Sequence, residues 1–161
     1  RNRGGFYQSL EHLIRFNEVN ASLQMPWFAQ EIFLEAQATT DLTDPAYLEA
    51  LQQAKSISQS RLDDALTNNQ LDAIVAPSNG PGWLIENGDD GSSVNYVSSS
   101  GLAAIAGYPA ITVPAGYIDG MPVGISFFGA AFSEPELIGL AYAYEQRTQA
   151  RRAPELTSVS P

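Results

Sequence analysis

Hydroxyl groups are the most frequent side-chain groups in this sequence that could attack a substrate. Serines cluster at residues 92–93, directly after Gly91, and again at residues 98–100, just before Gly101. A serine nucleophile needs a base that takes its proton. His12 is the one histidine and Lys55 the one lysine, and neither stands at a suitable spacing from the serine clusters. We therefore predict loop and helix-capping roles for these serines, a surface role for His12 and a solvated position on a helix for Lys55.

Metal chemistry is poorly supported by the residue types present. The chain has no cysteine, which excludes disulfides and thiolate ligands, and one histidine cannot form a multi-histidine site. Glu86, Asp89 and Asp90 offer carboxylates, but the twelfth position counted from Glu86 is Val97, so the calcium-loop pattern fails. We expect a solvated turn there, with no metal site and no cofactor.

An aromatic residue in a polar loop is the best candidate for ligand recognition. Trp83 follows Asn79, Gly80 and Pro81 inside the longest irregular stretch, residues 78–99. Loops of this length in a compact domain usually carry function. Trp83 can contact a substrate or fold back as an anchor for a lid, and the sequence leaves both interpretations open.

The elements that must position this loop alternate between helices and strands. Helical spacing of apolar residues predicts helices over residues 6–17 and 29–38, with Trp27 and Phe28 as core anchors between them. Asp44-Pro45 predicts the start of a long helix that ends at residues 68–69. The remaining elements are strands over residues 71–76, 111–113 and 123–128 and helices over residues 101–106 and from 134 onward. Strands alternating with helices indicate an α/β fold.

Residues 107–129 predict a hairpin around which the other elements are arranged. Asp119-Gly120 is a strong two-residue turn signal between two apolar runs. The second run places Gly124 and Ser126 on one face, which leaves room for a helix, a neighbouring backbone or a ligand. The run over residues 71–76 has the pattern of a strand buried on both faces. Ser133 with Glu136 predicts a capping box at the final helix.

Composition limits the class of protein. The 161 residues, 44% of them hydrophobic, suffice for one domain with a real core. The net charge of −10, without a basic stripe, argues against nucleic acid and against an anionic membrane surface as partners. The longest apolar run is too short for a membrane span. Arg1-Asn2-Arg3 does not look like a natural start, so we expect the chain to begin inside a longer protein.

Two long segments resemble the carboxyl-terminal part of amidase-signature enzymes. The first is LDAIVAPSNGPGW, from Leu71, and the second is GLAAIAGYPAITVPAGYIDGMPVGISFFGAAFSEPELIGLAYAYEQ, from Gly101. The upstream segment FAQEIFLEAQATTDLTDPAYLEAL is similar to the helical region that precedes them in the peptide-amidase-like branch. The resemblance covers nearly the whole chain and implies a mixed sheet covered by helices on both faces. It also implies that residues 1–153 are the carboxyl-terminal portion of a single amidase domain, followed by a polar tail, residues 154–161.

The same resemblance implies an activity whose catalytic groups are elsewhere. Family members hydrolyse carboxamides with a serine nucleophile, a second serine and a lysine base, all within a glycine/serine-rich signature that this chain lacks. No catalytic residue is therefore assigned here. The loop after residue 77 would lie at the end of a strand, where ligand sites form in α/β folds. We expect Asn79, Gly80, Pro81 and Trp83 to line the substrate entrance.

The resemblance also implies partners and leaves an alternative open. The expected partners are the amino-terminal part of the same amidase and a small amide substrate, and a homo-oligomer stays open. The alternative is a non-catalytic assembly module, or a small-ligand binding module, of amidase-like fold. The sequence does not fix the compartment, although a cytoplasmic location is favoured.

Overall fold

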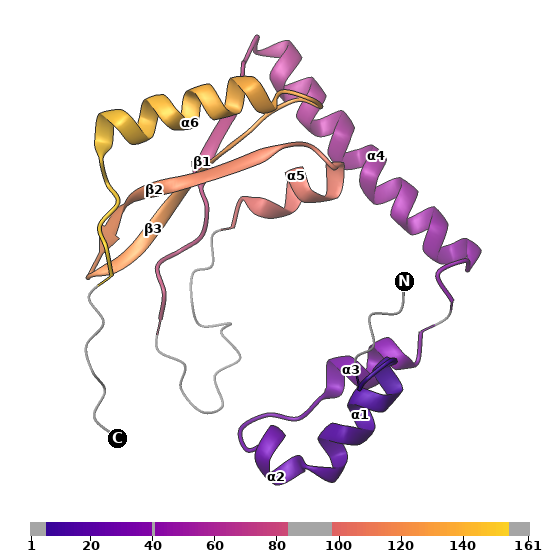
Figure 1. Cartoon of the computed structure of the whole chain (residues 1–161). Coiled ribbons are helices and arrows are strands. Elements are labelled where there is room, and N and C mark those ends of the chain that lie inside the picture. The colour runs from indigo at the N-terminus through magenta and orange to yellow at the C-terminus, as the bar shows by residue number, and fades with distance from the viewer. Residues whose placement is uncertain (1–5, 40, 84–97, 155–161) are drawn as a thin grey trace. The chain divides into compact units, whose positions relative to one another are not determined.

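The chain packs as two compact units. The computed structural model describes residues 6–39, 41–83 and 98–154. The first unit comprises residues 1–48 and the second residues 49–161, so that the boundary falls inside a long helix. Figure 1 shows the elements of each unit along the chain. That residues 1–153 form the carboxyl-terminal portion of a single amidase domain stays a prediction.

Three short helices form the first unit. They are α1 (Leu10–Val19), α2 (Ala21–Gln24) and α3 (Glu31–Gln37). The hydroxyl of Ser9 accepts a hydrogen bond from the His12 amide at 3.2 Å, which caps α1. Gln30 joins the helices, because its side chain accepts from Asn17 and donates to the Ile14 carbonyl. The two predicted helices are confirmed with shifted ends, whereas α2 was not predicted.

Trp27 and Phe28 are not core anchors within the described residues. Their side chains are 73% and 79% exposed on the connection between α2 and α3. Val19, Leu23 and Ile32 are also exposed in this unit. The interpretation failed because aromatic type alone does not specify which surface will cover a side chain. Exposed apolar residues in such number mark a surface suited to contact with more protein.

The long helix α4 (Pro45–Asn68) begins where the sequence predicts. Asp44 Oδ1 accepts a hydrogen bond from the Ala46 amide at 2.8 Å, and Pro45 occupies the first helical position. Its buried residues are Ser58, Leu62 and Leu66, spaced by four, so one narrow stripe faces the core.

The sheet has three antiparallel strands in the order β1–β3–β2. They are β1 (Ile74–Pro77), β2 (Ala110–Ile118) and β3 (Met121–Phe128). Asp119 and Gly120 both have positive φ, 49° and 82°, as a two-residue hairpin turn requires, so the predicted hairpin is confirmed. The predicted double burial of the first strand is wrong. β1 lies at the edge of the described sheet, and Val75 is 52% exposed.

A β-bulge interrupts the hairpin. Gly116 pairs with Val123, but Pro114 pairs with Gly124, which leaves Ala115 as an extra residue on β2. Beyond the bulge, Thr112 lies directly opposite Ser126.

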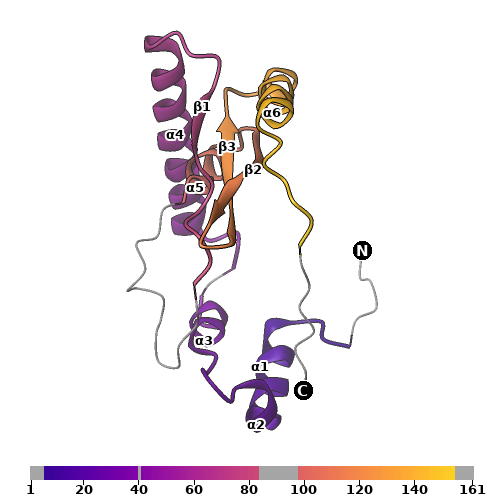
Figure 2. The same cartoon turned by 90° about the vertical axis from the view of Figure 1, so that its left-hand side faces the viewer.

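Helices cover both faces of the sheet, which confirms that part of the predicted α/β fold. On one face, the ring of Tyr144 in α6 (Glu134–Thr148) contacts Phe127 at 5.9 Å between centroids. On the other face, Phe128 forms a core with Leu62 of α4 and with α5 (Ser100–Ala106), which contributes Ala103 and Ala106. Figure 2 shows the sheet between α4 and α6.

Two polar contacts fasten α4 to the end of α5 and to the segment that follows it. The Tyr108 hydroxyl lies 2.9 Å from both carboxylate oxygens of Asp63, and the Gln59 side chain donates to the Ala106 carbonyl at 2.9 Å. The hydrogen bond to Asp63 raises the pKa of Tyr108, because the carboxylate favours the protonated phenol. Gly107, with φ 73°, permits the turn between Ala106 and Tyr108.

The start of α6 differs from the predicted capping box. Ser133 makes no side-chain bond to the helix, and its hydroxyl instead donates back to the Ala130 carbonyl at 2.8 Å. A serine hydroxyl can donate to a preceding carbonyl as readily as it accepts from a following amide. Here it donates to the preceding carbonyl. Pro135 and the acidic residues of the first turn still favour a helix start at this position.

We predict that Leu62→Ala destabilises the chain by about 2–5 kcal/mol, because it leaves a cavity between α4, α5 and β3. Leu62 is 1% exposed. Ile57→Ala on the same helix is the matched control, because Ile57 is 61% exposed and its loss should cost less than about 0.5 kcal/mol. Urea denaturation followed by circular dichroism measures both changes. Equal destabilisation by the two substitutions would contradict the assigned core.

Candidate functional site

The segment that leaves β1 is held against the start of α5 and against β3. The Ser78 amide donates to the Gly124 carbonyl at 2.9 Å, and the Ser99 amide donates to the Ser78 carbonyl at 3.3 Å. Asn79 and Ser98 form an isolated antiparallel bridge. The two ends of the long predicted loop, residues 78–99, therefore meet beside the sheet.

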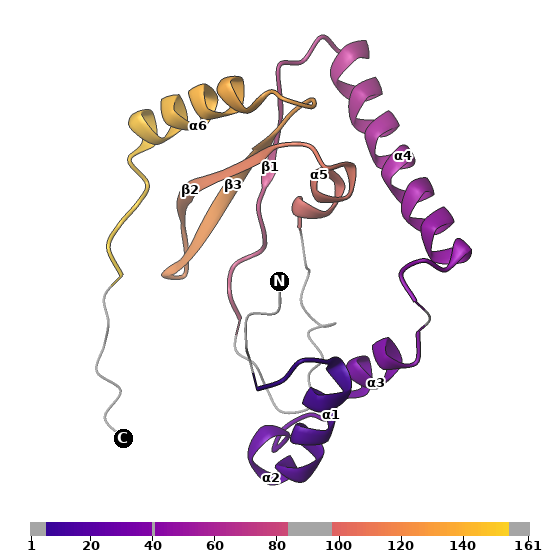
Figure 3. The same ribbon diagram turned by 45° about the vertical axis from the view of Figure 1, so that its right-hand side comes forward.

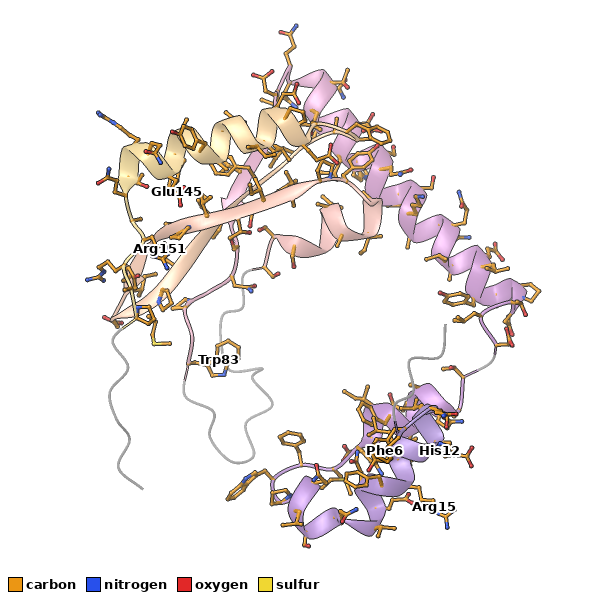
Figure 4. All side chains as sticks on the ribbon, viewed as in Figure 1. Phe6, His12, Arg15, Trp83, Glu145 and Arg151 are labelled. Carbon is orange, nitrogen blue, oxygen red and sulfur yellow. The ribbon has the colours of Figure 1, made fainter. Side chains whose placement is uncertain are left out.

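All four residues of the predicted substrate entrance lie in this segment. Gly80 and Pro81 are half-buried, whereas Asn79 and Trp83 are exposed, Trp83 by 46%. Figure 4 shows Trp83 at the end of the described segment, beyond the sheet. A Cβ added to Gly82 would lie 2.6 Å from Met121 Cε, so the segment passes close to the turn end of the hairpin. Contact of the four predicted entrance residues with a substrate stays a prediction.

Three hydroxyls, which we call the hydroxyl cluster, lie next to this segment on the α5 face of the sheet. Ser126 Oγ lies 2.6 Å from Ser78 Oγ and 2.8 Å from Thr112 Oγ1. The Ser78 and Thr112 oxygens are 3.4 Å apart. Ser126 is buried and Thr112 is exposed, so the cluster reaches from the core to the surface. Sequence reasoning placed Ser126 on a small face but did not foresee its partners.

A buried hydroxyl without a partner lies close by. Among the described residues, Ser99 Oγ is a buried side-chain oxygen with no hydrogen bond. Leaving such a group unpaired costs about 1–3 kcal/mol, so it calls for a polar partner. Its backbone amide is bonded to Ser78, which places this hydroxyl beside the start of the candidate entrance.

The other candidates from the sequence do not join this site. Residues 91–93 and the carboxylates of Glu86, Asp89 and Asp90 lie outside the described residues. His12 is exposed on α1 and Lys55 is exposed on α4, as expected. Within residues 6–39, 41–83 and 98–154, no three histidine, cysteine or carboxylate side chains are grouped as metal ligands would be. No helix in that part is both long and apolar enough to span a membrane.

The described site offers hydroxyl, amide and aromatic groups. Hydroxyls can donate and accept hydrogen bonds, which suits the C=O and N–H of an amide group. The exposed Trp83 ring adds a flat apolar surface. Chemically, this combination is suited to binding a polar group beside a flat apolar surface.

The family of the chain follows from its similarity to known proteins. The family described as Amidase matches residues 9–138. The chain therefore belongs to the amidase family, and its solved neighbours have the amidase-signature fold.

Individual relatives agree with that assignment. A probable amidase from Arabidopsis thaliana is 40% identical over 150 residues, 92% of this chain and 26% of the relative. The peptide amidase from Stenotrophomonas maltophilia superposes with a TM-score of 0.82 at 47% identity, covering 94% of this chain and 30% of that one. A glutamyl-tRNA(Gln) amidotransferase subunit from Methanosarcina barkeri is 33% identical over 118 residues, 70% of this chain and 24% of that protein. The chain thus spans about a quarter to a third of the length of these relatives.

We predict that Gly124→Ala destabilises the chain by about 1–3 kcal/mol through overpacking. The new methyl group would lie 2.9 Å from Thr112 Cγ2 and 3.0 Å from Ser78 Oγ, which forces the hydroxyl cluster apart. Gly139→Ala in α6 is the control, because nothing lies within 4 Å of its added Cβ, and it should stabilise by about 0.5–1 kcal/mol. Urea denaturation compares the two variants. A neutral Gly124→Ala would mean that the cluster is loosely packed.

Proposed function

We propose that this chain forms the carboxyl-terminal part of an amidase that hydrolyses carboxamides to a carboxylate and ammonia or an amine. The single observation that carries the proposal is the superposition on peptide amidase. It covers 94% of this chain at 47% sequence identity. In this proposal residues 1–153 are one portion of a single amidase domain. The catalytic serine, second serine and lysine lie upstream, within the amino-terminal part of the same protein.

The described residues support a binding role in that reaction. A serine oxygen attacks the amide carbonyl, the lysine takes the proton through the second serine, and backbone amides stabilise the oxyanion. None of these groups is assigned to the present chain. Asn79, Gly80, Pro81 and Trp83 instead line the entrance for the substrate. The unpaired Ser99 hydroxyl supports this placement, because an amide group entering beside Ser78 would supply the missing polar partner.

A second function is favoured by the amidotransferase relatives. Those proteins are subunits by name, and one is 33% identical to this chain. The exposed apolar residues of the first unit, among them Trp27 and Phe28, also suit contact with further protein. This second candidate is a non-catalytic assembly module, or a small-ligand binding module, of amidase-like fold.

The activity of the intact polypeptide separates the two functions. We expect the polypeptide that contains this chain to release ammonia from a small carboxamide, and we expect replacement of its signature serine by alanine to abolish the release. The present 161 residues alone should show no hydrolysis. An intact polypeptide without the signature serines and lysine, or without hydrolysis of any amide in a broad series, would favour the assembly module.

We predict that Trp83→Ala in the intact polypeptide lowers kcat/KM by about ten-fold, equivalent to about 1.4 kcal/mol of lost transition-state binding. The indole surface at the entrance is removed while the catalytic groups remain. Trp27→Ala is the matched control, since it removes the other tryptophan, which lies in the first unit, and should change kcat/KM by less than about two-fold. Initial rates across several amides measure both. Unchanged kcat/KM in Trp83→Ala across the series would remove this residue from the entrance.

A further inference from the structure

A hollow lies at the turn end of the hairpin, in the second unit. It has a volume of about 590 Å³ and shares no residue with the substrate entrance. Its described walls are Tyr117, Gly120 and Pro122 of the hairpin and Arg152, Ala153 and Pro154 after α6. Figure 3 shows the segment after α6 running down past the turn of β2 and β3. We call this hollow the Arg152 pocket.

Arg152 is held in place by Tyr117. Its guanidinium carbon lies 3.8 Å above the centroid of the Tyr117 ring. The Tyr117 hydroxyl accepts a hydrogen bond from the Arg152 amide at 3.1 Å and donates to the Arg152 carbonyl at 3.4 Å. Backbone and side chain of Arg152 are therefore both attached to a strand of the sheet. A binding group fixed in this way loses little conformational entropy when it takes a ligand.

The charge on Arg152 is not neutralised by the described residues. None of their carboxylates forms an ion pair with it, although the sequence carries 18 acidic residues against 8 basic ones. It is also the only charged residue among the described walls of the pocket. Stacking on Tyr117 occupies the face of the guanidinium and leaves its N–H donors, which lie along the edge, available for a ligand.

We propose that the Arg152 pocket binds a small organic carboxylate. The forked N–H groups of a guanidinium match the two oxygens of a carboxylate and form charge-assisted hydrogen bonds with them. The apolar surfaces of Tyr117, Pro122 and Pro154 suit the hydrocarbon body of such a ligand. The volume falls within the range of about 300–1,000 Å³ that is usual for small-molecule sites. This site is separate from amide hydrolysis and does not depend on it.

Calorimetric titration of the intact polypeptide with 3-phenylpropionate tests the proposal. Arg152→Gln should weaken binding by about ten-fold or more, because the charge-assisted bonds are lost. Arg151→Gln is the matched control, since it removes the same charge from the neighbouring exposed residue and should change affinity by less than about two-fold. Figure 4 shows Arg151 on the same segment. Tyr117→Leu should weaken binding as well, because Arg152 then loses its support.

Two further probes decide the chemical class of the ligand. The neutral 3-phenylpropan-1-ol should bind at least about ten-fold more weakly than the acid, and inorganic phosphate should not displace the acid. Comparable binding of the alcohol would reduce the site to an apolar hollow, and displacement by phosphate would contradict the choice of an organic carboxylate. Equal affinity in Arg152→Gln and the parent protein, or an equal loss in Arg151→Gln, would overturn the proposal.

Carboxylate binding and amide hydrolysis are measured separately, so that the pocket and the amidase proposal can fail independently. Circular dichroism of each variant shows that it is folded, and amide hydrolysis by Arg152→Gln should match that of the parent. No amide hydrolysis by the parent polypeptide, together with Arg152-dependent carboxylate binding, would count against the amidase proposal alone. Full hydrolysis by the parent without Arg152-dependent binding would count against the pocket alone.

Discussion

The bulge at Ala115 decides which side chains of the hairpin meet. A two-residue turn at Asp119 and Gly120 without a bulge would pair Thr112 with Phe127 and place both on the α6 face. The extra residue shifts the register by one, so that Thr112 lies opposite Ser126 instead. Because opposite residues in an antiparallel pair share a face, this shift separates the aromatic contact with α6 from the hydroxyl cluster. Both the core and the candidate entrance depend on this shift in register.

The α5 face of the sheet is consequently divided along its length. Toward one end, Phe128 packs with Leu62 and the small residues of α5, and this apolar part holds the helices. Toward the other end, Ser126 and Ser78 bring hydroxyls to the place where β1 leads into residues 79–83. Strand β3 thus packs into the core through Phe128. Two residues earlier, Ser126 contacts Ser78, where the candidate entrance segment begins. The hydroxyl cluster is therefore held by a rigid element, a condition that favours accurate positioning of bound groups in general.

Local chemistry in the sequence predicted the elements better than their surroundings. Asp44-Pro45 and Asp119-Gly120 act through their own backbone, and both signals were confirmed. Burial depends on distant partners, which explains the wrong expectations for Trp27, Phe28 and the first strand. The contacts between Tyr117 and Arg152 join positions 35 residues apart and have no local signal. The Thr112 and Ser126 pair could be found only with the bulge known. The family resemblance indicated an activity, but it placed the catalytic groups outside this chain.

The division into two compact units has a practical consequence for spectroscopy. The chain contains two tryptophans, and Trp27 falls in the first unit whereas Trp83 falls in the second. Both indoles are substantially exposed, so their emission should respond to whatever covers them. Removing either one leaves a single fluorophore whose signal belongs to one unit. The order in which the two units lose structure can therefore be followed by intrinsic fluorescence, without any attached dye.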